Sequence, residues 1–278
     1  MTAQRFSISM LLRYVIAIFI ALVVLIPLVM TVFGGLKTTG DLLSNPIRWP
    51  ADHLHWENYD GILQSSSFWV QMRNSLFIML VTATGVVLLG SMPAFIFARI
   101  NFPGRELCFN FFTLGLLFPL AVAILPLYIS LRQMGLIDSH WGIILPQIAF
   151  GLPGTILILR GFFLALPQEI EDAAYIDGCT TFGLFRHVAI PLMRPALAAV
   201  FVLAMVGSWN AFFLPLLVLN REPLWTLPLG IMRFQGQWGT DWARILAFVS
   251  LTLIPTIIFY FFAERHIVTG LTAGAVKG

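Results

Sequence analysis

Charged side chains are scarce in this chain. Only 10% of its 278 residues are Asp, Glu, Lys or Arg, whereas 59% are hydrophobic. A soluble globular domain carries about 25% charged residues, because polar groups have to cover its core. The shortage therefore excludes an ordinary water-soluble fold and indicates that lipid surrounds much of the surface. The formal net charge of +3 is small and scattered along the chain, which argues against a nucleic-acid-binding surface.

Cysteine and lysine occur only twice each. Cys108 and Cys179 have no neighbours at the spacing of a metal or redox motif, so we interpret them as packing residues. A phosphate-binding loop requires Gly-Lys-Ser or Gly-Lys-Thr after a strand, and neither Lys37 nor Lys277 stands in such a sequence. We therefore expect no ATP site, no other cofactor and no metal ion in this chain.

Long apolar runs dominate what is present. About 20 apolar residues are needed to cross ~30 Å of hydrocarbon as a helix. The first run is too long for a secretory signal peptide and lacks a cleavage site, so we expect it to remain as a helix. The pattern predicts an all-α polytopic membrane protein with one domain, residues 1–278. The six candidate spans are 13–35, 75–98, 108–131, 142–165, 196–219 and 245–263.

The loop between the fourth and fifth spans predicts a short helix, a turn and a second helix. Pro167 suits the first turn of a helix, acidic residues then favour the positive end of its dipole, and Gly178 stands where a left-handed residue ends a helix. Thr180 or Thr181 can cap a second helix, which we expect Pro191 to end. The first helix would expose small alanines to a partner. An amphipathic helix resting on lipid is the alternative, but its acidic first half would be repelled by anionic headgroups.

The same loop carries a family resemblance. Glu171-Asp172-Ala173-Ala174-Tyr175-Ile176-Asp177-Gly178, followed by Phe185 and Ile190-Pro191-Leu192, resembles the "EAA" loop of the permease subunits of ATP-binding-cassette (ABC) importers. Asp172 stands where many members have Glu, which keeps the charge. The resemblance implies the type I importer permease fold, with loop 167–195 as a coupling helix seated on a separate ATPase. The residues it assigns to this coupling are Glu171, Asp172, Ala173, Ala174, Asp177, Gly178, Phe185 and Pro191.

Further motifs are similar to the carbohydrate-importing branch of that family, and in particular to the smaller permease of the maltose importer. They are Asn74-Ser75-Leu76, Gly135-Leu136-Ile137-Asp138-Ser139, Trp209-Asn210, Thr226-Leu227-Pro228-Leu229-Gly230 and the tail from Gly270 to Gly278. Met92-Pro93-Ala94-Phe95 departs from the usual pattern of the second span.

The resemblance also implies the partners and the location. The partners would be a second homologous permease, two ATPase subunits that hold ATP and Mg²⁺, an extracytoplasmic sugar-binding protein and the sugar itself. The chain would lie in the cytoplasmic membrane of a bacterium or archaeon. An even number of spans puts both termini on one side, and we expect the cytoplasmic side because the acidic loop must face the ATPase.

A neutral polyhydroxy ligand is held by hydroxyl and amide hydrogen bonds and by aromatic stacking. The candidate residues for its path are Gln147, Ser208, Trp209 and Asn210. Disaccharide, longer glycan, polyol and glycerol phosphodiester all stay open as ligands.

Two other functional classes fit less well. Ion-coupled carriers and channels commonly place ionisable groups within the membrane, and a membrane-embedded enzyme needs such groups clustered at depth. The span cores contain none. His53 and His55 fall in an external loop, where we interpret them as a chance surface pair.

Overall fold

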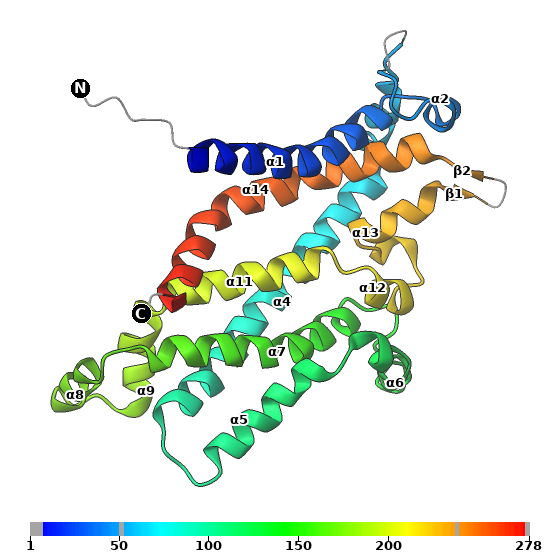
Figure 1. The fold of residues 1–278 in the computed structure, drawn as a ribbon. Coiled ribbons are helices and arrows are strands. Elements are labelled where there is room, and N and C mark those ends of the chain that lie inside the picture. The colour runs from blue at the N-terminus through cyan, green and yellow to red at the C-terminus, as the bar shows by residue number, and fades with distance from the viewer. Residues whose placement is uncertain (1–7, 50–52, 237–238, 276–278) are drawn as a thin grey trace. The chain divides into compact units, whose positions relative to one another are not determined.

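The structure is a computed structural model that describes residues 8–49, 53–236 and 239–275. Within these residues it is helical except for one short hairpin (Figure 1). Lys277 and Gly278, the end of the tail noted above, lie outside the described residues. The chain divides into two compact units, Met1–Ser66 with Ile231–Pro255 and Ser67–Gly230 with Thr256–Gly278.

The first unit is built on the long apolar helix α1 and the first half of α14. Hydrophobic side chains along α1 are exposed, as expected of a helix whose solvent is lipid. Its elements are α1 (Ile8–Gly34), α2 (Thr39–Ser44), α3 (Glu57–Leu63), η4 (Ile231–Phe234), β1 (Gln235–Gly236), β2 (Gly239–Thr240) and the start of α14 (Trp242–Ala275). The two strands pair antiparallel, with Gln235 opposite Thr240.

Hydrogen bonds tie the connections of this unit to the end of α1. The buried Lys37 ammonium donates to the carbonyl oxygens of Asn45 and Pro46, each at 3.0 Å. The Asn58 amide donates to the carbonyl oxygens of Gly35 and Lys37, also at 3.0 Å each. The backbone at Asn45 and Pro46 and the side chain of Asn58 are therefore held against the end of α1.

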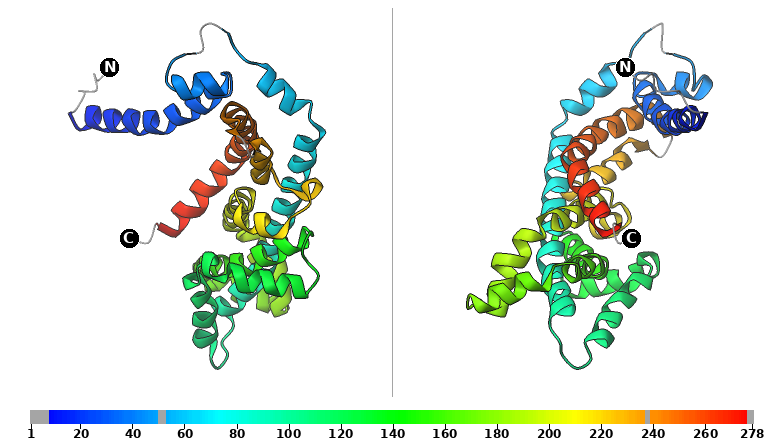
Figure 2. Two further views of the ribbon diagram at one scale, coloured as in Figure 1. Left: turned by 90° about the vertical axis from the view of Figure 1, so that its right-hand side faces the viewer. Right: turned by 60° about the vertical axis from the view of Figure 1, so that its left-hand side comes forward.

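The second unit contains the remaining helices and the loop singled out in the sequence. Its elements are α4 (Ser66–Arg99), α5 (Arg105–Leu114), η1 (Gly115–Leu117), α6 (Leu120–Gln133), α7 (Trp141–Leu164), α8 (Gln168–Ile176), α9 (Thr181–Gly183), the π-helical turn η2 (Leu184–Ala189), α10 (Ile190–Leu192), α11 (Arg194–Trp209), α12 (Phe213–Val218), η3 (Glu222–Leu224), α13 (Leu227–Gly230) and the end of α14. Figure 2 shows the turns of α8 and α9 standing out from the ends of α4 and α7.

The predicted membrane-spanning character is confirmed. In the described part of the chain, four helices are long and apolar enough to cross a membrane: α1, α4, α7 and α14. Two bent helix pairs raise the number to six if each pair crosses as one span. The third and fifth predicted spans are not continuous helices; each is interrupted.

The third predicted span, 108–131, is broken. Phe118 is extended (φ −89°, ψ 106°) because the ring of Pro119 disfavours a helical conformation in the preceding residue. The helices on either side are bent by 102°.

The fifth predicted span, 196–219, also divides, because α11 ends at Trp209 and α12 begins at Phe213. The Asn210 side-chain amide donates to the carbonyl oxygen of Val206 at 2.9 Å, and such local bonding competes with continuation of a helix.

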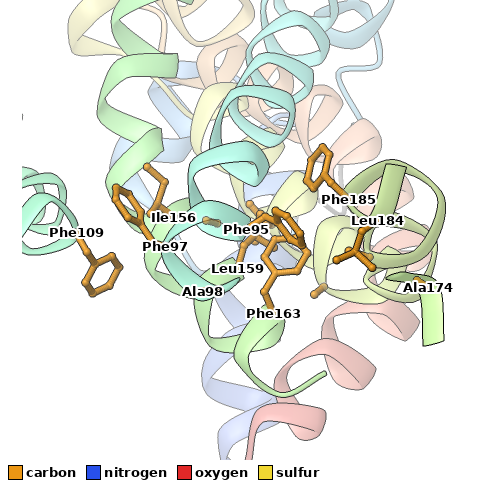
Figure 3. Packing of buried hydrophobic residues seen from close by; sticks show 14 residues of the cluster. Phe95, Phe97, Ala98, Phe109, Ile156, Leu159, Phe163, Ala174, Leu184 and Phe185 are labelled. Carbon is orange, nitrogen blue, oxygen red and sulfur yellow. The ribbon is translucent and has the colours of Figure 1, made fainter. Parts of the chain in front are cut away.

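The hydrophobic core of the second unit joins the spans to the loop after α7. Phe95 of α4 lies edge-on to Phe163 of α7, with ring centroids 5.5 Å apart, and 5.2 Å from Phe185 of η2. Leu184 and Ala174 belong to the same cluster (Figure 3). The packing therefore attaches the loop directly to α4 and α7.

Close packing at the start of α7 generates a stability prediction. A Cβ at Gly142 would collide with the carbonyl oxygen of Leu136 and lie 2.9 Å from Val218 Cγ1, whereas a Cβ at Gly161 of the same helix would meet nothing within 4 Å. We expect Gly142→Ala to destabilise the fold by about 1–3 kcal/mol through overpacking. Gly161→Ala should be neutral or stabilising by up to about 1 kcal/mol. Thermal unfolding of both variants in one detergent checks this, and equal midpoints would contradict it.

Candidate functional site

Helix α8 ends in the turn that the sequence predicts. Gly178 has φ +81°, in the left-handed region. Its N–H donates to the carbonyl oxygen of Tyr175 at 3.0 Å, and the N–H of Cys179 donates to that of Ala174 at 2.9 Å. These two bonds make a Schellman motif, which satisfies the last carbonyl groups of the helix. The predicted position and conformation of Gly178 are confirmed.

The second helical run begins as expected and ends later than expected. Thr180 caps it, with its hydroxyl oxygen accepting from the N–H of Gly183 at 3.1 Å. Pro191 does not stop the run, which continues to Leu192 and bends by 77° before α11. Pro191 stands in the first turn of α10, directly after the π-helical turn η2, and a first-turn proline needs no N–H.

The two alanines of the loop face opposite ways. Ala173 is exposed, as predicted, but only 8% of Ala174 is accessible, because it packs in the core cluster with Leu184 and Phe185. The expectation that both alanines are free for a partner is therefore wrong for Ala174. The most exposed apolar side chains of α8 and the turn after it are Ile176, which is 86% exposed, and Phe182, which is 62% exposed; Ile170 and Tyr175 are partly exposed as well.

Glu171 also faces inward. Its carboxylate lies 2.7 Å from Nε of Arg99 at the end of α4, and the two side chains are only 14% and 13% exposed. The contact is an ion pair without an aligned hydrogen bond between those two atoms. Nη2 of Arg99 additionally donates to the carbonyl oxygen of Leu166 at 2.5 Å.

Within this chain the charge of Glu171 is therefore already paired with that of Arg99. The acidic residues that α8 and its turn leave at the surface are Glu169, Asp172 and Asp177, all exposed.

A separate cavity of about 600 Å³ lies among α4, α7 and α11. Gln147, Ser208 and Asn210 line it, together with apolar groups that include Phe150 and Phe212. Three of the four residues predicted for a ligand path therefore come together. Trp209 does not line the cavity: it is buried, with its ring 5.5 Å from that of Phe259.

Gln147 leaves a hydrogen-bond donor unused at this cavity. Its Oε1 accepts from the Ser208 hydroxyl at 2.6 Å and from the Thr82 hydroxyl at 3.2 Å. In this orientation of the amide, both hydroxyl groups donate to its oxygen, and its nitrogen points away from them. Nε2 is then buried without a hydrogen-bond partner among the described residues. A buried donor of this kind favours a ligand that offers an oxygen acceptor.

Sequence reasoning missed two of these residues. Arg99 is a basic residue at the end of a span, which ordinarily indicates a position at the membrane interface. Thr82 is one of several hydroxyl residues within the spans. Nothing in the sequence pairs Arg99 with Glu171 or Thr82 with Gln147, because the members of each pair are far apart in the chain. Thr82 and Gln147 are 65 positions apart.

Comparisons with known proteins agree with this architecture. The family model described as the binding-protein-dependent transport system inner membrane component matches residues 86–269. NgcG, a diacetylchitobiose uptake system permease protein of Streptomyces coelicolor, is 32% identical over 259 residues, 92% of this chain and 85% of the relative. AraQ, an arabinooligosaccharides transport system permease protein of Bacillus subtilis, is 31% identical over 279 residues, 99% of each chain.

The fold matches a solved structure as well. A chain in the crystal structure of a bacterial ABC transporter involved in the import of the acidic polysaccharide alginate superimposes with a TM-score of 0.79. The match covers 95% of this chain and 99% of that one at 20% sequence identity, so it concerns the fold alone.

The spans, the protruding loop and the cavity define a multi-pass helical membrane protein built for transport. The chain belongs to the family of binding-protein-dependent transport system inner membrane components, the permease subunits of ABC importers. The family resemblance and the type I permease fold read from the sequence are confirmed.

The ion pair at the base of α8 generates the next prediction. Removing one member of a buried pair leaves an uncompensated charge and costs about 3–5 kcal/mol. We expect Glu171→Gln and Arg99→Gln each to lower the unfolding temperature, and the double variant to lose much less than the sum of the two. Glu169→Gln, at an exposed acid of the same helix, is the matched control and should change little. A double-mutant cycle measures the coupling, and additive losses would contradict the pairing.

Proposed function

We propose that this chain is one half of a heterodimeric pore that imports a neutral sugar, driven by separate ATPase subunits. The observation that carries the proposal is the protruding α8 turn, which exposes Ile176 and Phe182 while its other face is anchored in the core. Large apolar side chains at a protein surface mark an interaction site. The residues proposed to couple with the ATPase are Asp172, Ala173, Asp177 and Gly178 at the surface, with Glu171, Ala174, Phe185 and Pro191 supporting them from within.

Charge distinguishes the two possible partners of this turn. Asp172 and Asp177 lie exposed beside the apolar residues. An anionic membrane surface would repel them, whereas a basic groove on a protein would attract them. We therefore propose that the partner bound to this turn is an ATPase subunit, which would carry the ATP and Mg²⁺. It also puts this turn and both termini on the cytoplasmic side, with a single permease domain over residues 1–278.

The cavity supports a neutral ligand. Its described lining contains hydroxyl, amide and apolar groups and no charged or histidine side chain. The free donor of Gln147 suits a sugar hydroxyl or ring oxygen. Relatives are named as transporters of diacetylchitobiose, arabinooligosaccharides and trehalose, which favours a di- or oligosaccharide.

An extracytoplasmic sugar-binding protein completes the proposed assembly. The family name itself specifies binding-protein dependence. A second solved relative in fold is described as an alginate transporter in complex with a pentasaccharide-bound periplasmic protein. Alternating access would follow: ATP binding moves α8, α8 moves the spans, and the cavity opens toward the binding protein.

One experiment tests the coupling surface. Ile176→Arg puts a charge into the proposed contact without disturbing the fold, because residue 176 is exposed. Burial of an unpaired charge costs several kcal/mol, so we expect ATPase association, and with it sugar uptake, to fall at least about tenfold. Asp172→Glu keeps the charge and should retain both. The assay reconstitutes each variant with its partner subunits and measures ATPase retention and uptake separately. Normal retention and uptake by Ile176→Arg would remove α8 as the contact.

A serine pair tests the cavity. Ser208 lines it and donates to Gln147, whereas Ser91 is buried in α4, donates to the Leu88 carbonyl oxygen of its own helix and lies off the cavity. Loss of a hydrogen bond costs about 0.5–1.5 kcal/mol, so we expect Ser208→Ala to lower uptake about two- to tenfold with ATPase retention unchanged. Ser91→Ala should leave uptake near the wild-type level. If the two variants transport equally, the cavity is not on the sugar's path.

A further inference from the structure

We propose that His53, His55 and Glu57 form a binding site for a transition-metal ion, and we commit to Zn²⁺. His53 and His55 precede α3, and Glu57 is its first residue. All three belong to the first compact unit. They are far along the chain from the cavity and from the coupling turn, the name used here for loop 167–195. Each offers one ligand atom, and these atoms all lie within 4.8 Å of one another. This proposal is independent of the sugar and of the ATPase.

The local backbone brings the three groups together. Residues 53–55 have no regular secondary structure and lead into α3. The rings of His53 and His55 lie edge to face, with centroids 4.7 Å apart. The chain then turns into α3, which brings the Glu57 carboxylate to 2.5 Å from Nδ1 of His55.

Two of the three ligands are held in place before any ion binds. The backbone N–H of His55 donates to the carbonyl oxygen of Leu36 at 2.9 Å, and the N–H of Asn58 donates to that of His55 at 3.3 Å. The Asn58 side chain is in turn bonded to the end of α1, as described above. His55 and Glu57 are thus positioned by the surrounding fold, and only His53 has to close onto them.

The chemistry of this donor set selects the ion. Two imidazoles and one carboxylate suit Zn²⁺, which takes three protein ligands and a water molecule in open sites, whereas Mg²⁺ and Ca²⁺ prefer all-oxygen sites. Ligand atoms of a tetrahedral zinc site lie about 3.3 Å apart, so small rotations of side chains are enough.

Binding would replace a proton with the ion. In the hydrogen bond between His55 and Glu57, the N–H at Nδ1 donates to the carboxylate oxygen. Zn²⁺ takes the lone pairs of both atoms, and any proton held there leaves to solvent. No oxidation or reduction is involved. The sequence alone indicates only a pair of surface histidines. The structure shows that Glu57 lies close to both, which makes a site with three ligands.

The test measures Zn²⁺ binding directly. The full-length chain, purified with its partner subunits, without a polyhistidine tag and after treatment with a chelator, is titrated with Zn²⁺ against a chromophoric chelator. His53→Ala, His55→Ala and Glu57→Gln are compared with the wild type. His187→Ala is the matched control, because it removes one exposed histidine from the coupling turn and leaves the proposed ligands intact. Melting temperatures measured without metal verify that the variants are folded.

We expect the wild type and His187→Ala to bind the same number of Zn²⁺ ions. His53→Ala should bind one fewer per chain. The affinity at this site should fall at least about tenfold in each of the three ligand variants. Co²⁺ in place of Zn²⁺ should give the visible absorption of a tetrahedral site in the wild type and lose it in Glu57→Gln. Equal stoichiometry and affinity in the wild type and His53→Ala would overturn the proposal. His53 is exposed, so that variant remains informative if His55→Ala folds poorly.

Discussion

The ion pair between Arg99 and Glu171 is the constraint on which the proposed coupling depends. α8 lies outside the spans and is short, so tertiary contacts alone can hold it. The pair binds α8 to the end of α4, and the bond from Arg99 to Leu166 binds the same point to the connection after α7. Separating two largely buried charges is costly, so the three segments are expected to move together. Ala174 and Phe185 add an apolar contact on the same side.

One irregular stretch of backbone in the second unit, between α11 and α12, lines the cavity. Asn210, Phe212 and Phe213, at the break between α11 and α12, all line the cavity. In lipid, backbone that is not helical is tolerated only where protein or a polar cavity surrounds it. Broken helices are also the elements that transporters use to form binding sites. The end of α11 at Trp209 is therefore part of how the cavity forms, and Trp209 itself serves to pack that end against Phe259.

How far the sequence predicts this molecule depends on the range of the interaction. Pro167, Gly178 and Thr180 act on neighbouring backbone groups, and the turns they predict are confirmed. Helix length follows from the length of an apolar run. The breaks at Pro119 and Asn210 arise from the proline ring and from a side-chain hydrogen bond to the backbone, which hydropathy does not register. The inward orientation of Glu171 could not be predicted, because its partner Arg99 is distant in sequence. The cavity gathers Gln147 and Ser208 for the same reason, through a contact between two separate helices.

The cavity and the coupling turn together constrain where the free energy for transport can enter. A cavity lined, in its described part, by hydroxyl, amide and apolar groups offers no side chain that titrates or pairs with an ion. A neutral ligand in it also gains nothing from the membrane potential, which acts on charge. Work on such a ligand has to reach the cavity mechanically, through packed elements with two arrangements. Among the described residues, α8 and α9 offer such a route. They present Ile176 and Phe182 outward, while Glu171 and Ala174 fasten α8 to the helices that reach the cavity. In the proposed function, the uncharged lining and the firmly attached outer helix serve one requirement: that another protein supply the energy.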